Sequence, residues 1–283
     1  MRTRFAPSPT GPLHLGHAYS AMLAYDMAAK AGGEFLLRIE DIDQSRARPK
    51  WEEQIYDDLR WLGLEWPEPV MRQSDRMPAY QDALTKLEGM GLLYRCTCNR
   101  RDIEAAVSAP QEGVEPAYGP DGLIYPGTCR NAGHTDSNAA LRLDMAKACA
   151  MLSNPVLEFS ETGPAHKGSH RITPDELIHR VGDIVLARRD MGTSYHLSVV
   201  LDDAAQEITD VIRGKDLFDA TKIHILLQAL LGLPTPAYHH HRLIRDENGK
   251  RLAKRDDARA IAKYRDDGAS PADIRTMLEL PRT

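Results

Sequence analysis

The chain lacks an apolar run long enough to cross a bilayer, and no basic leader followed by an apolar stretch precedes its first motif. We therefore expect a cytoplasmic monomer without membrane contact. It also lacks a basic excess: 36 basic and 41 acidic side chains give a formal net charge of −5. Such a balance excludes a general nucleic-acid coat, so any RNA contact has to come from local patches. The 283 residues suffice for one main domain with an insertion.

Cysteine is scarce, with four residues in the chain. Cys96, Cys98 and Cys129 gather in one region near Tyr125, while Cys149 stands apart in a stretch with helical spacing. A cytoplasmic chain has little use for disulfides, and clustered thiolates suit zinc. Three reduced, unligated thiols are the alternative, because no Cys-x-x-Cys pair is present.

The segment from Phe5 to His17 is the most informative part of the chain. Its prolines forbid a helix until the segment ends, and residues 18–31 then have helical spacing, so His14, Gly16 and His17 lie where a helix begins. Free backbone N–H groups and the helix dipole favour phosphates there. Gly16 lets a flat purine approach, and both imidazoles can donate hydrogen bonds to phosphates. A metal pair or a chance helix start is the alternative for two histidines at this spacing.

This segment resembles the first signature of class I aminoacyl-tRNA synthetases, in the form carried by the glutamyl and glutaminyl enzymes. Arg-Phe-Ala-Pro-Ser-Pro-Thr-Gly there leads into His-Leu-Gly-His, as it does here from Arg4 onwards. The resemblance implies an α/β fold, a Rossmann-type catalytic domain with a zinc-containing insertion and a short helical C-terminal segment. It also implies ATP with Mg²⁺ as a substrate, with His14, Gly16 and His17 in the nucleotide site.

The implied glutamate pocket is formed by Arg4, Phe5, Ala6, Pro7, Ser8, Glu40, Tyr195 and Arg213. Two guanidiniums and a phenol suit a side-chain carboxylate, and Glu40 suits the substrate ammonium. Such a pocket rejects glutamine, because a neutral amide leaves buried charge unpaired. Ordinary surface ion pairs are the alternative for Arg4 and Arg213.

Residues 249–255 resemble the second class I signature, the mobile lysine loop usually written Lys-Met-Ser-Lys-Ser. Lys254 falls on its second lysine, which is expected to neutralise the leaving pyrophosphate. The match is degraded, because Arg251, Ala253 and Arg255 replace a lysine and two serines. Positive charge is kept and hydroxyl contacts are lost. Without the motif, a basic run such as this is usually a solvated face.

We expect four segments along the chain. Residues 1–95 form the first half of the Rossmann domain, 96–180 the zinc-containing insertion, 181–235 the second half, and 236–283 the lysine-loop segment with terminal helices. Helical spacing predicts packing helices over residues 49–64, 78–90 and 220–233, and two short ones over 256–267 and 271–280. Residues 183–190 and 195–203 are expected to resume the sheet as strands, followed by a buried strand within 207–217 and another over 238–244.

The cysteine cluster resembles the zinc site of short glutamyl-synthetase paralogues, where a tyrosine supplies the fourth ligand. The resemblance implies Cys96, Cys98, Tyr125 and Cys129 as ligands. Zinc would have to depress the phenol pKa strongly, so His134 is a rival ligand. The run His239-His240-His241 is expected to pack or face solvent, because alternate strand residues point to opposite faces.

The end of the chain points to a particular branch of this family. Two short helices follow Lys254, where a full glutamyl enzyme continues into an anticodon-reading domain, and Val199 replaces an asparagine usual in the full-length bacterial enzymes. These features resemble a stand-alone paralogue that activates glutamate and attaches it to the queuosine base at the wobble position of tRNA(Asp). Alternatives are a minimal glutamyl-tRNA synthetase charging the acceptor end, a smaller adenylyl-transferring enzyme, and a catalytically idle tRNA-binding module. In the queuosine-directed paralogue, a basic face around Lys250, Arg251, Arg255 and Arg259 is expected to hold the anticodon stem of the tRNA.

Overall fold

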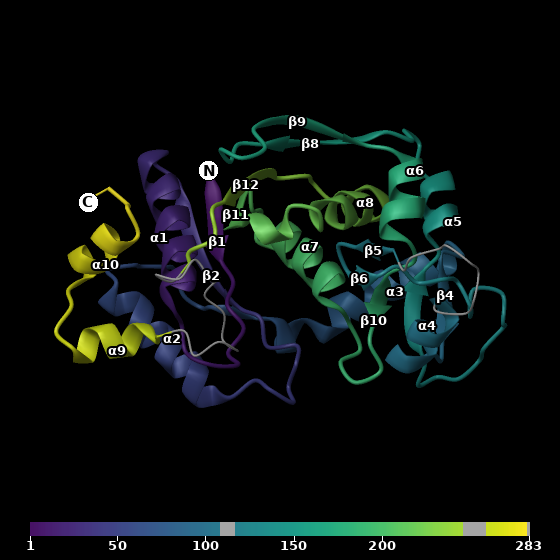
Figure 1. Ribbon diagram of the computed structural model, residues 1–283, viewed down its shortest axis with the longest axis horizontal. Coiled ribbons are helices and arrows are strands. Elements are labelled where there is room, and N and C mark those ends of the chain that lie inside the picture. Colours follow the sequence, from purple (N-terminus) through teal and green to yellow (C-terminus); the bar gives the residue numbers. More distant parts are fainter. Residues whose placement is uncertain (108–116, 246–258, 282–283) are drawn as a thin grey trace.

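The computed structural model describes residues 1–107, 117–245 and 259–281. Its elements divide into two lobes (Figure 1). Helices α7 (Tyr195–Ala205) and α8 (Thr221–Leu231) lie between the lobes and form a middle layer. One lobe carries the first strands and both ends of the chain, and the other carries the middle of the sequence. Among the described residues, no helix combines the length and apolar character that crossing a membrane requires.

A parallel sheet forms the centre of the first lobe. Strand β1 pairs with β2 and β2 with β3, all in parallel. Strands β11 and β12 also pair in parallel, and β11 lies beside β1, where Thr209 N donates to Arg2 O at 3.0 Å. The resulting order β3-β2-β1-β11-β12 confirms the predicted doubly wound sheet. The strands are β1 (Arg2–Phe5), β2 (Glu34–Ile39), β3 (Met71–Arg72), β11 (Asp210–Gly214) and β12 (Ala237–His241).

The helices predicted from the spacing of apolar residues over residues 18–31, 49–64, 78–90 and 220–233 are all present, and α1 (Leu15–Lys30) packs directly on β1 and β2. Their apolar sides are buried, as in α8, where nearly every residue is buried and Gly232 ends the helix in the left-handed conformation. A short 3₁₀ turn, η1 (Gln73–Arg76), leads into α3, and another, η3 (Lys215–Leu217), follows β11. The helices are α1 (Leu15–Lys30), α2 (Pro49–Trp61), α3 (Met77–Gly89), α7 (Tyr195–Ala205) and α8 (Thr221–Leu231).

The prediction of a strand over residues 195–203 is wrong, because this segment is helix α7. The Ser194 side chain caps the helix by accepting from Leu197 N at 3.4 Å. A short, fully buried apolar run is compatible with a strand or with a buried helix. The Ser194 cap is the local feature that favours the helix in this segment. The strand expected over 183–190 shortens to β10 (Val185–Ala187), and it pairs with β7 (Ala140–Leu143) of the second lobe rather than with the parallel sheet.

The second lobe has an antiparallel sheet of order β10-β7-β4. Hairpin β5–β6 lies beside η2, and hairpin β8–β9 runs over the top of the molecule and joins β12 where Glu161 pairs with Tyr238. The elements are β4 (Leu93–Cys96), α4 (Arg100–Val107), β5 (Tyr118–Gly119), β6 (Gly122–Leu123), β7 (Ala140–Leu143), α5 (Met145–Ala150), β8 (Leu157–Glu161), β9 (Gly168–Ile172), α6 (Pro174–Glu176) and the π-helix η2 (Leu177–Val181).

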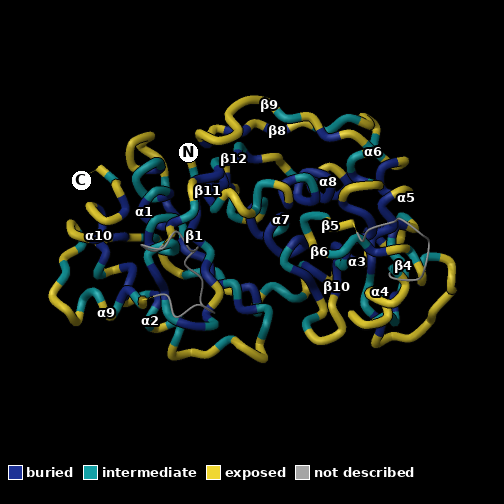
Figure 2. The backbone as a smooth tube through the Cα atoms, in the orientation of Figure 1, coloured by how far each residue is buried: buried dark blue, intermediate teal, exposed yellow. Residues whose placement is uncertain are grey.

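The buried side chains form two main hydrophobic cores. One core packs α3, α5, α7, α8 and strands of the second lobe together, and the other packs α1, α2, β1 and β2 with the C-terminal helices. Figure 2 shows the buried backbone running through both lobes, with exposed loops at the rim. The first core therefore continues from α7 and α8 into the second lobe and packs the two lobes against each other.

The C-terminal helices α9 (Ile261–Asp266) and α10 (Pro271–Met277) pack beside α1. Arg275 donates to both carboxylate oxygens of Asp26 at 2.8 and 2.9 Å, which fixes α10 to α1. The helix predicted over 271–280 is therefore present. Of the helix predicted over 256–267, the residues before 259 lie outside the described residues, and α9 begins at Ile261.

Candidate active site

His14 and His17 lie at the first turn of α1, as predicted. His14 is the N-cap, and its Nδ1 accepts from Gly16 N at 3.1 Å, while His14 N donates to His17 Nδ1 at 3.2 Å. The two ring centroids are 3.8 Å apart. A Cβ at position 16 would lie 3.0 Å from the His14 ring, which explains the glycine. Reciprocal capping thus orders both imidazoles beside the positive end of the helix dipole.

The chain returns to this helix start near its C-terminus. Ile261 N donates to Leu13 O at 2.8 Å, and Ala260 forms a bridge with His14. Lys254 precedes Ala260 by six residues in the sequence. Lys254 itself and the rest of the 249–255 motif lie outside the described residues, as do Lys250, Arg251 and Arg255 of the expected basic face.

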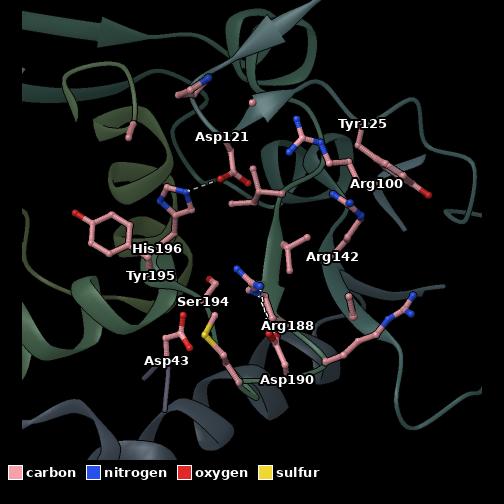
Figure 3. A pocket seen from close by; sticks show the side chains of 18 of the residues that line it. Asp43, Arg100, Asp121, Tyr125, Arg142, Arg188, Asp190, Ser194, Tyr195 and His196 are labelled. Atoms are coloured by element: carbon pink, nitrogen blue, oxygen red, sulfur yellow. Dashed lines mark hydrogen bonds and ion pairs between the residues drawn. The ribbon is translucent and has the colours of Figure 1, made fainter. Parts of the chain in front are cut away.

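A cavity of about 1090 Å³ lies between the two lobes. Ser8, Glu40 and Tyr195 line it from the first lobe and the middle layer, so three of the predicted glutamate-pocket residues share one cavity. Figure 3 shows Tyr195 and His196 on one wall, with Asp43 below them. The opposite wall comes from the second lobe and carries Arg100, Asp121, Tyr125, Arg142, Arg188 and Asp190.

The other predicted pocket residues belong to β1, the turn after it and β11, and they do not line the cavity. Arg4 and Arg213 are each 5% exposed, and Phe5 and Pro7 are buried. Glu40 N donates to Pro7 O at 3.0 Å, which joins the first signature to the end of β2. Ala6 is half-buried between them. The two segments predicted to build one pocket therefore lie side by side.

A buried charge cluster that the sequence did not reveal supports Glu40. Arg38, with no exposed surface, donates to Glu40 at 3.1 Å and to Asp203 at 2.8 Å. Arg4 binds the same Asp203 through two hydrogen bonds of 2.9 and 3.2 Å. Burial raises the pKa of Glu40 despite Arg38 and Arg4. Burial also acts to raise the pKa of Asp203, but the two guanidiniums outweigh it and lower that pKa.

Arg38 and Asp203 left weak signals in the sequence. Arg38 is a charged residue between Leu37 and Ile39 in an apolar strand, and Asp203 follows a run of apolar residues. Buried charges are rare unless paired, so either position marks a partner elsewhere. The partner cannot be identified from the sequence, because 165 positions separate the two residues.

Arg213 has a different environment from Arg4 and Arg38. Its guanidinium donates to the side chains of His240, His224 and Thr221 at 3.0, 3.0 and 2.7 Å, and to Leu217 O at 3.2 Å. All four acceptors are uncharged groups when the imidazoles are neutral. Tyr195 lies nearby: burial raises its pKa, and Arg213 opposes the shift. Among the described residues, no carboxylate contacts the Arg213 guanidinium to neutralise its charge.

The three predicted cysteine ligands come together in the second lobe. The Sγ atoms of Cys96, Cys98 and Cys129 all lie within 4.8 Å of one another, and those of Cys98 and Cys129 are 3.4 Å apart. Tyr125 Oη is 3.5 Å from the Sγ atoms of both Cys96 and Cys98. Ligand atoms of a tetrahedral zinc site are roughly 3.3–3.8 Å apart, so this arrangement is compatible with zinc. His134, the rival ligand, is exposed, and its Nε2 lies 3.3 Å from Thr97 Oγ1.

Two other features remain outside this cluster. Cys149 is buried in α5, and burial raises the pKa of its thiol to about 11. His239 contacts Thr162, His240 contacts Glu161, and His241 contacts Ser20. In the described part of the chain, these histidines form no metal-binding group. His240 is buried and also accepts from Arg213 at 3.0 Å, so it belongs to a polar network as well as to the packing of β12.

Comparisons with known proteins agree with this geometry. The model of the family "tRNA synthetases class I (E and Q), catalytic domain" matches residues 1–281. The Glutamyl-Q tRNA(Asp) synthetase of Rhodobacter capsulatus is 64% identical over 280 residues, covering 99% of this chain and 100% of that protein. The protein of the same name from Nocardia farcinica is 42% identical, covering 97% and 82%.

Solved structures give the same fold. A glutamate tRNA ligase from Elizabethkingia meningosepticum, in complex with its amino acid, superposes with a TM-score of 0.74 at 27% identity. The match covers 98% of this chain and 60% of that structure, so the chain spans about three-fifths of its length. A methionyl-tRNA synthetase of Mycobacterium tuberculosis, 10% identical with a TM-score of 0.63, shares the fold. The chain therefore belongs to the class I tRNA synthetases (E and Q), within the group whose curated members are named Glutamyl-Q tRNA(Asp) synthetase.

Proposed function

We propose that the protein activates L-glutamate with ATP to form glutamyl-adenylate and transfers the glutamyl group to the queuosine base at the wobble position of tRNA(Asp). The observation that carries this proposal is the 64% identity to a Glutamyl-Q tRNA(Asp) synthetase over the whole length of both chains. The cavity supports the choice of amino acid.

Glutamate binds, in this proposal, with its ammonium at Glu40 and its side-chain carboxylate near Arg213 and Tyr195. Glu40 and Tyr195 line the cavity, and Arg213 keeps a charge that its uncharged neighbours do not cancel. Arg4 is already paired with Asp203, so it supports the pocket electrostatically rather than as the main carboxylate ligand. Glutamine would leave the charge of Arg213 unpaired in a buried place, which disfavours its binding.

ATP binds at the start of α1, with its phosphates near His14, Gly16 and His17 and near Lys254. The glutamate α-carboxylate attacks the α-phosphorus: an O–P bond forms to the carboxylate, and the bond to the leaving pyrophosphate breaks. The helix dipole, the imidazoles and Lys254 stabilise the negative charge that develops. Mg²⁺, bound with ATP, supplies further charge neutralisation. A hydroxyl of the modified base then attacks the mixed anhydride and releases AMP, so no side-chain nucleophile is required.

Zinc, held by Cys96, Cys98, Cys129 and Tyr125, supplies structural cross-linking to the second lobe. The fit rests on the mutual distances of these side chains and on their chemistry, since thiolates are preferred zinc ligands. Tyr125 Oη also accepts from Cys129 N at 2.8 Å, which orders the phenol within the cluster. His134 lies at the edge of the cluster and is the alternative fourth ligand.

The insertion predicted over residues 96–180, which forms most of the second lobe, receives the anticodon loop. Arg100 lines its side of the cavity and is 92% exposed, and Tyr118 is 76% exposed on hairpin β5–β6, so phosphate contacts and base stacking are both available. A flipped-out wobble base then reaches the adenylate across the cavity.

A minimal glutamyl-tRNA synthetase is the second candidate, favoured by the likeness to glutamate tRNA ligase structures. Transfer of labelled glutamate separates the two. We expect label on tRNA(Asp) that contains queuosine, including tRNA(Asp) without its 3′-terminal adenosine, and none on unmodified tRNA(Asp) or on tRNA(Glu). Label on tRNA(Glu) that disappears when the terminal adenosine is removed would favour the second candidate.

A further inference from the structure

The guanidinium of Arg213 is held by an unusual set of acceptors. Arg4 and Arg38 donate to carboxylates, but Arg213 donates to the imidazoles of His224 and His240, one hydroxyl and one carbonyl. Its guanidinium also lies over the Tyr238 ring, 5.2 Å from the ring centroid. His224 and His240 are each 1% exposed. A carboxylate in either place would orient the guanidinium equally well and would also cancel its charge. Neutral imidazoles orient it and leave the charge available.

The direction of each hydrogen bond can be worked out from Arg213 outwards. Arginine only donates, so His240 Nε2 and His224 Nδ1 are acceptors and carry no proton. The His240 proton is therefore on Nδ1, which lies 2.5 Å from the Glu161 carboxylate. Glu161 also accepts from His240 N and Gly163 N at 2.9 and 2.6 Å.

The second arm leads from Arg213 to the cavity. The His224 proton is on Nε2 and is donated to His196 Nδ1 at 3.1 Å. His196 then carries its proton on Nε2, 3.3 Å from Asp121 Oδ1. Asp121 lies at the turn of hairpin β5–β6, lines the cavity, and is joined to His196 across it (Figure 3). One directional chain thus links Arg213 to the second lobe.

Local electrostatics keep the two inner imidazoles neutral. Burial and then the charge of Arg213 lower the pKa of His224 well below its usual value. The same two causes, in the same order, lower the pKa of His240 to about 4 even though Glu161 opposes them. Both rings therefore remain acceptors for Arg213 at neutral pH.

We propose that His224 and His240 are positioning residues that hold Arg213 through uncharged acceptors, and that His196 and Asp121 extend this hold to hairpin β5–β6. The inference rests on the proposed function in taking Arg213 as a glutamate-binding residue. It adds a physical connection between hairpin β5–β6, on the side of the cavity proposed to receive the tRNA, and Arg213, which is proposed to bind the glutamate side chain. A base that enters the cavity and hydrogen-bonds to Asp121 acts on the same chain that orients Arg213.

Glutamate-dependent exchange of pyrophosphate into ATP tests the inner end of the hydrogen-bond chain, where His224 contacts Arg213. We expect His224→Leu to raise the KM for glutamate roughly tenfold to hundredfold, because a charge-assisted hydrogen bond to Arg213 is lost. The KM for ATP should change less than twofold. His224→Asn places an amide oxygen near the position of Nδ1 and should recover most of the loss. Equal KM values for glutamate in His224→Leu and the wild type, or failure of His224→Asn to recover, would overturn the role of His224.

The outer end of the hydrogen-bond chain is tested at Asp121, on the surface of hairpin β5–β6, where a substitution does not disturb the hydrophobic core. Asp121 is 46% exposed, and Asp121→Ala should raise the KM for glutamate roughly twofold to tenfold, since His196 loses the acceptor that fixes its tautomer. Asp190→Ala is the matched control: Asp190 lines the same cavity, is 62% exposed, and pairs with Arg188, which is not part of the hydrogen-bond chain. The same KM for glutamate in both variants would overturn the connection to the hairpin.

Long-range ¹H–¹⁵N spectra of the histidine rings separate this inference from the proposed function. At pH 7 we expect Nε2–H in His196 and His224 and Nδ1–H in His240. An inactive wild type with these tautomers would refute the proposed function and leave the hydrogen-bond chain standing. Active wild-type protein with the opposite tautomers in His224 and His240 would refute the inference and leave the proposed function standing.

Discussion

Asp58 is a buried carboxylate whose ionisation should destabilise the folded protein. It lies in α2 with no exposed surface, and neither oxygen has a hydrogen-bond partner among the described residues. Arg265 Nη2 is 3.9 Å from its Oδ1. Burial raises the pKa of Asp58 from 3.8 to about 6, and Arg265 offsets this only in part.

The sign and size of the effect follow from this shift. The folded pKa lies above the unfolded one, so the protonated form stabilises the folded state. That stabilisation is complete below pH 4, declines as the pH rises towards 6, and is absent above it. A shift of about two units corresponds to roughly 3 kcal/mol. Asp58→Asn removes the titration, so its free energy of unfolding relative to the wild type should increase by roughly 2 kcal/mol between pH 4 and pH 7, most of the full effect.

Urea unfolding followed by circular dichroism at pH 4, 5, 6 and 7 measures this difference directly. Glu53→Gln is the control, because it removes a carboxylate charge from an exposed position on α2 that does not contribute to the Asp58 shift, and it should give a nearly constant difference. A constant difference between Asp58→Asn and the wild type from pH 4 to pH 7 would refute the reasoning.

Three further predictions concern the site. Lys254→Ala and His14→Ala should each lower pyrophosphate exchange at least about 100-fold, and His14→Ala should also lower stability by about 1 kcal/mol, because it removes the N-cap of α1. Near wild-type exchange in Lys254→Ala would show that the loop is wrongly assigned. Gly16→Ala should raise the KM for ATP severalfold, because the added methyl group displaces the His14 ring, and an unchanged KM would contradict that contact. Elemental analysis should find one zinc per chain, lost in Cys129→Ser; retention of zinc in Tyr125→Phe would assign the fourth ligand elsewhere.

Local features of the structure could be predicted from the sequence. The start of α1 was predictable because Pro7, Pro9 and the cap at His14 all lie within a few residues of one another. The helix at 195–203 was predicted as a strand, because its apolar run has no clear period and the decisive cap, Ser194, is a single residue.

Long-range polar contacts could not be predicted in the same way. The contact of Glu161 with His240 joins positions 79 apart, and that of His196 with Asp121 joins positions 75 apart. No periodicity encodes such pairs, because each depends on how separate elements pack. The cysteine cluster was predictable by residue type, since few side chains suit zinc, although the distances in it required the structure.

The place of β1 at the centre of the parallel sheet has a consequence for synthesis of the protein. Its neighbour β11 is about two hundred residues further along the chain, as shown by the hydrogen bond from Arg2 N to Thr209 Oγ1, which spans 207 positions. At about 5–20 residues per second, β1 waits roughly 10–40 s for this neighbour to be made. During that interval one edge of β1 lacks its final partner, so the first lobe is open to proteases or chaperones. Proteolysis of ribosome-bound chains should therefore show the first lobe becoming resistant only after β11 has emerged.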